Sequence, residues 1–350
     1  MSLQRIEALR ALFPAWQCDV LIIEAPIDLY YLTGLRLSAG RLLIGIDSAQ
    51  LFVDGRYLAI AQEKSPVPVA PLEKKHQRAW LERVGGKRIG FDSASMSYDQ
   101  YSKCAEIFDK TMLPIVSPLK TLRMIKDPEE REKMRKSAAL AKEGVRHLCR
   151  ALASGITEKE MAWQFEKFCR ERGAASMAFA PIIAFGENTS FPHHRSSERP
   201  YKEGEPVLID VGCIMDDYAS DVSRTLWSAE VAPQFSHLHE IVVRSQKAAL
   251  AICRPGISIG ELDAAARRVM REAGVEELFV HGLGHGIGLE THEFPRISLK
   301  AEERDLLLQE GMVITIEPGL YVAGVCGARH EDTVIVTNEG PENLYGEIDV

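Results

Sequence analysis

The sequence of 350 residues lacks any long hydrophobic run, because no apolar stretch approaches the ~18 residues that a membrane-spanning helix requires. Residues 1–13 also contain no apolar run of about seven residues and no small-residue cleavage site, so we expect no signal peptide. We therefore predict a protein that does not act in a membrane.

The sequence also lacks an excess of positive charge and a pattern of paired cysteines. Its 42 lysines and arginines against 50 acidic residues leave a net charge of −8, which argues against nucleic-acid binding through a basic face. The seven cysteines are odd in number, scattered and without a CxxC pair, so we expect neither a disulfide framework nor a structural zinc site. Free thiols are typical of the reducing cytoplasm, and we predict that location.

What the sequence does contain is the composition of an ordinary globular protein, with 46% hydrophobic and 26% charged residues. Its length predicts about two domains. A turn signal at Ser117-Pro118 and a helix start at Asp127-Pro128 place the boundary within 117–127. We predict domains of residues 1–120 and 121–350.

In the first domain, short apolar runs of strand length alternate with helical patterns. Such alternation is typical of an α/β layer with a mostly buried sheet. The predicted strands are 19–23, 41–46, 51–53, 88–91 and 113–116, and the predicted helices are 57–64, 74–85 and 97–108.

The second domain begins with two helices, over about 128–153 and 157–173, and Thr157 with Glu160 forms a capping box at the second start. Two β-hairpins are predicted further on, each near a pair of helices. This arrangement suggests an internal duplication, although no residue-level repeat proves it. The remaining predicted elements are strand 181–185, hairpin 207–214 with 218–227, helices 233–253 and 258–274, helix 300–309, and hairpin 312–322 with 328–337.

Each predicted hairpin carries two acidic residues in apolar strands, where acids are depleted and almost never fully buried unless paired. A turn centred between residues 215 and 216 places Asp210 opposite Asp221, and a turn centred on Gly324 places Glu317 opposite Glu331. Like charges that face each other repel, and burying each one costs several kcal/mol. A pair of divalent metal ions is the simplest compensation, because oxygen ligands suit Mn, Co, Zn or Fe(II) and a carboxylate can bridge two ions.

A glycine-rich segment over 281–293 contains His281, His285 and His292. Its alternating glycines disfavour a helix and permit close approach of the backbone. Imidazole is a common ligand for the same metals, so one histidine beside four carboxylates would complete a five-ligand set for two ions. The glycines do not form a dinucleotide-binding fingerprint, because Ile287 stands where the third glycine is needed, which disfavours a nucleotide-binding α/β enzyme.

These motifs together resemble the pita-bread metallopeptidases, a family that includes methionine aminopeptidase, aminopeptidase P and prolidase. The stretches 28–34 and 53–57 are similar to the additional N-terminal domain of the proline-specific branch, which methionine aminopeptidases lack. The resemblance implies an α/β (α+β) fold, with a small creatinase-like domain followed by a curved antiparallel sheet covered by helices. The matching motifs are Asp-Val-Gly from Asp210 with Asp221 further on, His-Gly-Ile-Gly from His285, Ile-Glu-Pro-Gly around Glu317, and Arg-His-Glu-Asp around Glu331.

The same resemblance implies a role for each matching residue. Glu317 would move a proton, while His193 would act on the tetrahedral intermediate and His292 on the substrate carbonyl or scissile region. His281 and Arg329 match further positions that support the site or contact the substrate. Two divalent ions, with manganese the first choice and cobalt or zinc as alternatives, would be held by Asp210, Asp221, His285, Glu317 and Glu331.

The activity that the resemblance implies is hydrolysis of the Xaa-Pro bond of dipeptides or short peptides by a hydroxide that bridges the two ions. An arginine after His-Glu, here Arg296, would hold the C-terminal carboxylate of a dipeptide, which favours an Xaa-Pro dipeptidase (prolidase). The alternative is an Xaa-Pro aminopeptidase (aminopeptidase P), which removes the residue before proline. The resemblance also implies a homodimer.

Two other functions are compatible with the same two-domain layout. A catalytically inactive peptide-binding module is expected to have a degraded ligand set, and a creatinase-like amidinohydrolase needs no metal. All five ligand types are present in the family order, so the sequence favours the metallopeptidase over both.

Overall fold

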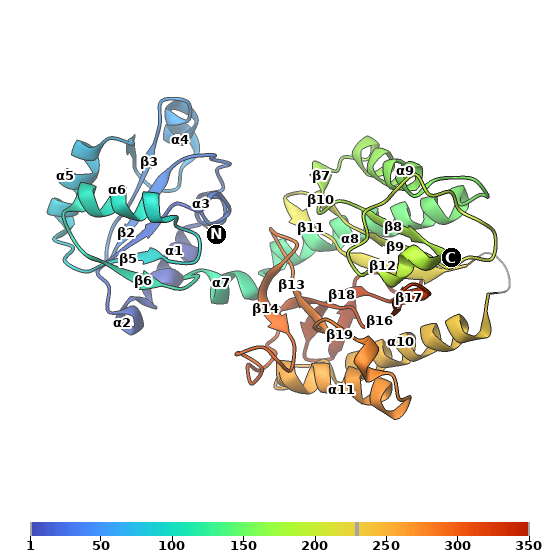
Figure 1. The fold of residues 1–350 in the computed structure, drawn as a ribbon. Coiled ribbons are helices and arrows are strands. Elements are labelled where there is room, and N and C mark those ends of the chain that lie inside the picture. Colours follow the sequence, from blue (N-terminus) through green and yellow to red (C-terminus); the bar gives the residue numbers. More distant parts are fainter. Residues whose placement is uncertain (1, 228–230, 349–350) are drawn as a thin grey trace. The chain divides into compact units, whose positions relative to one another are not determined.

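The computed structural model describes residues 2–227 and 231–348, and the chain divides into two compact units, Met1–Leu122 and Arg123–Val350 (Figure 1). Both units combine helices with strands, which confirms the predicted mixed α/β class. Within the described residues, no helix has the length and apolar character needed to cross a bilayer.

The N-terminal unit is built on one six-stranded mixed sheet. Its strands are β1 (Val20–Ile23), β2 (Arg41–Gly45), β3 (Ala49–Val53), β4 (Val69–Pro71), β5 (Ile89–Asp92) and β6 (Met112–Ile115). They lie in the order β4-β3-β2-β1-β5-β6, and both β1 and β2 are buried along their whole length, as their continuous apolar sequences indicate. Its helices are α1 (Ser2–Arg10), α2 (Phe13–Trp16), α3 (Pro26–Thr33), α4 (Leu58–Lys64), α5 (Lys74–Val84) and α6 (Tyr98–Phe108), and α7 (Lys120–Met124) includes the division point.

The C-terminal unit contains two helix pairs and a set of short antiparallel sheets (Figure 1). The helices are α8 (Pro128–Ala151), α9 (Glu158–Glu171), α10 (Pro233–Ile252) and α11 (Ile259–Glu272), with 3₁₀ turns η1 (Gly186–Ser190) and η2 (Glu276–Leu278). The strands are β7 (Ser176–Met177), β8 (Ile182–Phe185), β9 (Val207–Val211), β10 (Cys213–Met215), β11 (Tyr218–Ala219), β12 (Val222–Leu226), β13 (Gly284–Gly286), β14 (Glu293–Ile297), β15 (Val313–Ile316), β16 (Gly319–Val322), β17 (Cys326–Arg329), β18 (Asp332–Thr337) and β19 (Gly340–Asn343).

Each helix pair packs against its own group of strands. Helices α8 and α9 contact strands β7 to β11, whereas α10 and α11 contact strands from β14 onward. Two separate apolar cores result, one around Val145 and Phe165 and the other around Val242 and Leu262. The unit is therefore assembled from two halves, each with one helix pair and one of the predicted hairpins.

The predicted helix starts are confirmed where capping residues indicated them. Asp127 Oδ1 accepts hydrogen bonds of 2.9 Å from the N–H groups of Glu129 and Glu130 at the start of α8. Thr157 and Glu160 form the capping box that begins α9. These caps fix where each helix starts and thus which acids lie in its first turn.

The first hairpin differs from the prediction by two residues of register. Asp216 and Asp217 both have positive φ, 49° and 75°, so they form a two-residue turn whose centre lies one position later than predicted. Asp210 therefore lies opposite Ser223 and not opposite Asp221. A shift of two residues keeps each side chain on its face of the sheet, so Asp210 and Asp221 become diagonal neighbours on one face.

The second hairpin has the predicted register. Strand β15 pairs with β18, and β16 pairs with β17, in one continuous alignment that places Glu317 opposite Glu331. The ladder is interrupted between these two pairs of strands: the N–H of Glu317 donates to Leu283 O at 2.8 Å, and that of Glu331 donates to Ser223 O at 3.1 Å. The second contact joins the two halves of the unit at the position of the acids.

The helix predicted over 300–309 is wrong, because these residues form a series of turns. The N–H groups of Gly256, Ile259 and Gly260 donate to carbonyls of this segment at 2.8 to 2.9 Å. Leu308 returns a bond of 2.8 Å to the carbonyl of Ile257. These hydrogen bonds to the segment that precedes and begins α11 replace the bonds of a helix. The tertiary contacts thus override the helical pattern of the local sequence.

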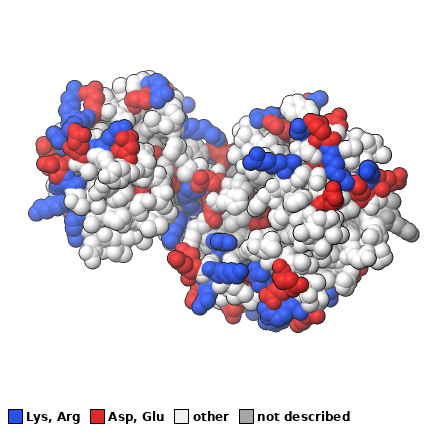
Figure 2. Space-filling view, in the orientation of Figure 1, with Lys and Arg blue, Asp and Glu red and all other residues white. Residues whose placement is uncertain are grey.

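Lysines and arginines are interspersed with acids over the face of the molecule drawn in Figure 2. Among the described residues on this face, no continuous basic stripe is visible. Charges of both signs are therefore mixed on this face.

Candidate active site

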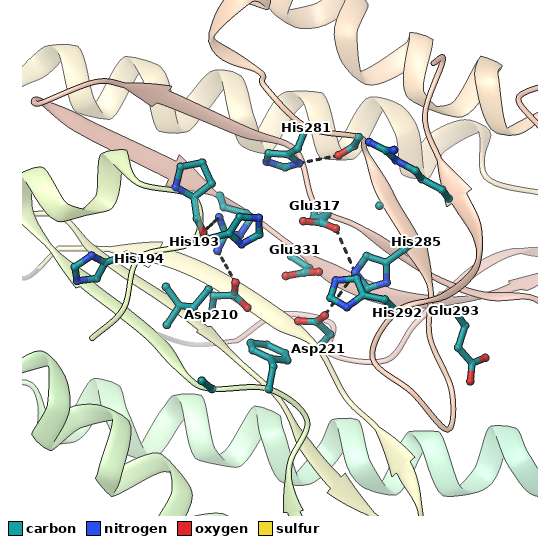
Figure 3. Close-up of a pocket in the computed structure, with 18 of the residues that line it drawn as sticks. His193, His194, Asp210, Asp221, His281, His285, His292, Glu293, Glu317 and Glu331 are labelled. Carbon is teal, nitrogen blue, oxygen red and sulfur yellow. Dashed lines mark hydrogen bonds and ion pairs between the residues drawn. The ribbon is translucent and has the colours of Figure 1, made fainter. Parts of the chain in front are cut away.

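A cavity of about 600 Å³ in the C-terminal unit contains every residue that the sequence singled out for chemistry. Its wall also includes an apolar patch of Phe179, Ala180 and Ile182. The two hairpins, the glycine-rich segment and the loop before the first hairpin all contribute side chains to it. The ten predicted residues that line it are His193, Asp210, Asp221, His281, His285, His292, Arg296, Glu317, Arg329 and Glu331 (Figure 3).

Four carboxylates and one imidazole converge at the centre of the cavity (Figure 3). Nε2 of His285 lies 3.4 Å from Glu317 Oε1 and 3.8 Å from Asp221 Oδ2. Ligand atoms of Asp221, His285 and Glu331 all lie within 4.8 Å of one another. Asp210 and Asp221 come from the first hairpin, whereas the two glutamates come from the second, so the cluster spans the junction of the two halves.

The carboxylates of this cluster are buried with too little positive charge to balance them. Burial and the neighbouring carboxylates raise the pKa of Asp221 and of Glu331 well above their usual range, and burial above all raises the pKa of Glu317 to about 8. Oδ1 of Asp210 is buried and has no hydrogen-bond partner. Bound divalent cations would offset the repulsion between these carboxylates and would give the unpaired Asp210 oxygen a partner. The cluster therefore has the chemistry of a metal site.

His285 presents a free nitrogen lone pair to these carboxylates. Its Nδ1 donates to Gly286 O at 3.0 Å, which places the proton on Nδ1 and leaves Nε2 unprotonated. Burial and the neighbouring His292 lower the pKa of His285 to about 4, so the ring is neutral at pH 7. The backbone beside it requires glycine, because a Cβ on Gly284 would lie 2.1 Å from Thr315 O. The ring is therefore oriented and protonated as a metal ligand needs to be.

Arg329 is engaged entirely with protein groups. Its guanidinium donates to Asp210 Oδ2 at 2.5 Å, to the Tyr321 hydroxyl at 2.6 Å and to Ser223 Oγ at 3.1 Å. The Tyr321 hydroxyl lies 3.1 Å from Nε2 of His281, whose Nδ1 donates to a backbone carbonyl. Arg329 and His281 are thus linked to each other, and to Asp210, through the Tyr321 hydroxyl and the Arg329 guanidinium.

The other predicted residues surround this centre. The ring centroid of His292 lies 4.2 Å from that of His285, and His193 lines the same cavity (Figure 3). Arg296 is exposed on β14, where it pairs with His285 across the strands and lines the cavity. An exposed guanidinium at the cavity wall is placed to meet an anionic group that enters from solvent.

Two glutamates with buried side chains near the cavity were not predicted from the sequence. Glu293 lines it and accepts ion pairs from Lys126 Nζ at 3.1 Å and from Arg123 Nη2 at 2.6 Å. No local sequence pattern predicts this contact, because Lys126 and Glu293 are 167 positions apart. From the sequence alone, Glu158 is one of the acidic residues that are common in the first turn of a helix, so nothing marks it as functional.

Residues 132–338 match the model of metallopeptidase family M24, and residues 5–125 match that of the creatinase/prolidase N-terminal domain. The Xaa-Pro dipeptidase of Pyrococcus furiosus is 34% identical over 343 residues, which cover 97% of each chain. The solved structure of an Xaa-Pro dipeptidase from Bacillus anthracis matches with a TM-score of 0.95 at 30% identity, covering 99% of this chain and 98% of that one. The X-Pro aminopeptidase of Thermotoga maritima matches with a TM-score of 0.87 at 30% identity, covering 95% and 96%.

Proposed function

The chain belongs to metallopeptidase family M24, as its motifs indicated, and from that premise we propose that it is an Xaa-Pro dipeptidase, a prolidase. One observation carries the proposal: five metal-ligand side chains share a cavity with the exposed Arg296. The ligands supply hydrolytic chemistry. The arginine supplies a bidentate partner for the carboxylate that directly follows the proline ring in a dipeptide.

We propose that two divalent ions are held by one imidazole and four carboxylates. The predominance of oxygen donors supports manganese as the metal, with cobalt or zinc as alternatives. When bound, such ions lower the pKa of a water molecule and polarise the scissile carbonyl. The ligands are Asp210, Asp221, His285, Glu317 and Glu331.

The remaining side chains have steps that their positions support. Glu317 takes the proton of the attacking water and delivers it to the proline nitrogen as the C–N bond breaks. His193 and His292 donate hydrogen bonds to the substrate carbonyl, where negative charge develops in the tetrahedral intermediate. Arg329 keeps Asp210 in place through their 2.5 Å contact, and His281 extends that support through Tyr321.

The second candidate is Xaa-Pro aminopeptidase activity, which the similarity to the Thermotoga maritima enzyme favours. A longer peptide has a further residue after proline, and its amide would displace the carboxylate from Arg296. In the dipeptidase the Arg296 guanidinium would bind the C-terminal carboxylate of the substrate, whereas in the aminopeptidase it would face the amide that follows proline. A catalytically inactive binding module is a remote third candidate, and the intact ligand set argues against it.

We further propose a cytoplasmic location and a homodimer. All seven cysteines are free thiols and six of them are buried, a pattern that suits a reducing compartment. The homodimer follows from the family resemblance, and light scattering at twice the mass of one chain would support it.

The deciding experiment compares substrates on protein loaded with Mn²⁺, with two ions per chain checked by elemental analysis. Ala-Pro and Met-Pro are tested beside the tripeptide Gly-Pro-Ala, with Asp221→Asn as the control for contaminating peptidases. Cleavage of the dipeptides alone supports the dipeptidase, and cleavage of the tripeptide transfers the assignment to the aminopeptidase. No cleavage of any substrate by fully loaded protein contradicts both.

A further inference from the structure

A buried carboxylate behind the cavity wall holds the loop that carries His193. Glu158 lies in the first turn of α9, and no part of its side chain is exposed. Its two oxygens accept five hydrogen bonds, all from residues 185–197. Thr157 and Glu160 already cap the helix, so these bonds are additional to what α9 itself needs.

The five donors lie on both sides of His193 in the loop. Oε1 accepts from the N–H of Phe185 at 2.9 Å and from the side-chain amide of Asn188 at 2.8 Å. Oε2 accepts from Nε2 of His194 at 2.8 Å, and from the N–H and Oγ of Ser197 at 2.8 and 2.6 Å. One carboxylate thus fixes the chain before and after the catalytic candidate.

The two adjacent histidines differ in their partners, because the Nε2 of His194 is bonded to Glu158. Both line the cavity, but in the view of Figure 3 the ring of His194 lies further from the carboxylate cluster than that of His193. The bond from His194 to Glu158 holds the second ring away from the centre. Because neighbouring residues share the backbone between them, fixing His194 restricts the directions open to His193.

Glu158 is suited to this task as an ion. Burial raises its pKa, but the hydrogen bonds from Ser197, Asn188 and His194 more than offset that effect, so the pKa lies below its ordinary value. The N-terminal end of α9 also favours negative charge. A carboxylate accepts hydrogen bonds at both oxygens, whereas glutamine in its place would turn an NH₂ group toward donors.

We propose that Glu158 is a positioning residue, which fixes the loop 185–197 and thereby aims His193 at the scissile carbonyl. The inference rests on the proposed function, since that function assigns His193 to the tetrahedral intermediate. It requires that loss of the carboxylate lowers turnover while metal content and substrate binding stay unchanged.

The kinetic test compares Glu158→Gln with Glu171→Gln, an exposed acid at the other end of the same helix. Both variants are loaded with Mn²⁺ and assayed on Ala-Pro. Glu158→Gln should lower kcat about 10- to 100-fold, the usual cost of losing a partner that orients an active-site group, with KM and metal content unchanged. Glu171→Gln should keep the kcat of the unmodified protein. Equal kcat in the two variants overturns the proposal.

A double variant separates positioning from a general structural loss. If Glu158 acts through His193, the substitution Glu158→Gln should cost little further kcat once His193→Ala is present. Independent losses that multiply in the double variant overturn the proposal. The milder Ser197→Ala, which removes one donor, should show a smaller loss of kcat that also vanishes beside His193→Ala.

Hydrogen exchange tests the same loop without reference to activity. Glu158→Gln should speed amide exchange within 185–197 by about tenfold or more, because charged hydrogen bonds are lost, while strands β9 and β12 keep their protection. Unchanged exchange in Glu158→Gln and Ser197→Ala overturns the proposal. Inactivity of the unmodified, metal-loaded protein toward every Xaa-Pro substrate refutes the proposed function instead, and the exchange result still decides whether Glu158 holds the loop.

Discussion

Replacing Glu317 by glutamine should stabilise the metal-free protein. Burial above all, with Asp210 nearby, raises the pKa of Glu317 from 4.5 to about 8. At pH 7 the native metal-free protein therefore holds a proton that the unfolded chain releases. A carboxyl whose pKa rises on folding reduces stability above its unfolded pKa, and the reduction grows until the pH reaches the folded pKa. Glutamine does not titrate and removes this cost.

The magnitude follows from the raised pKa. A rise from 4.5 to about 8 corresponds to about 3 kcal/mol at pH 7 and about 1 kcal/mol at pH 5. The side chain is 18% exposed, so the figure at pH 7 is an upper value. A domain of this size gains about 2–4 °C in Tm per kcal/mol. Glu317→Gln should therefore raise the Tm of the metal-free protein by up to about 10 °C at pH 7, and by much less at pH 5.

Metal should narrow this difference in stability between the two proteins. Divalent ions need ionised carboxylates, so the unmodified protein gains about 2.7 kcal/mol at a metal concentration 100 times its Kd. Glu317→Gln lacks one ligand and should gain less. The comparison thus links the charge repulsion of the cluster to the ions that would relieve it.

Thermal unfolding followed by circular dichroism, in EDTA and in Mn²⁺, at pH 5, 7 and 8, provides the measurement. Glu302→Gln removes an exposed acid of the same unit and should change stability by less than about 0.5 kcal/mol. A metal-free Glu317→Gln protein with a Tm at or below that of the unmodified protein at pH 7 would refute the view that these acids destabilise the metal-free fold.

Three further outcomes are expected. Arg296→Met should raise the KM for Ala-Pro about tenfold or more with little change in kcat, because a hydrogen bond to a charged group contributes about 1.5–3 kcal/mol. An unchanged KM in initial-rate assays would show that Arg296 does not contact the substrate. Asp221→Asn and Glu331→Gln should each abolish hydrolysis and bring elemental analysis below two ions per chain; full activity in either variant excludes that residue as a ligand. Lys126→Met should leave the buried Glu293 carboxylate short of a partner and destabilise the protein by about 3 kcal/mol, so an unchanged melting curve would contradict the importance of that ion pair.

The residues that line the cavity could be predicted because acids in apolar strands are anomalous in any register. Asp210 and Asp221 illustrate this, since the predicted pairing was wrong by two residues while the shared face was right. Side chains alternate between the two faces of a strand, so a register error of two residues leaves both carboxylates on the predicted face. The error itself came from the turn, where Asp216 and Asp217 both adopt positive φ.

Other features could not be predicted because remote partners determine them. Residues 300–309 have a helical pattern, but their carbonyls bind the backbone of 256–260 instead. Glu158 looks like an ordinary first-turn acid until the loop 185–197 folds onto it. Glu293 requires Lys126 from a segment that is distant in sequence. In each case the contact that decides the structure joins residues far apart in the sequence, so the local pattern of apolar and polar residues does not reveal it.

The junction between the two halves of the C-terminal unit has a consequence for the maturation of the protein. The backbone N–H of Glu331 donates to Ser223 across this junction, and Ser223 Oγ returns a bond of 2.6 Å to the Glu331 carboxylate. Each hairpin brings only two of the four acids, so neither half alone has a complete coordination sphere. A nascent chain can therefore capture its ions only after both halves have docked.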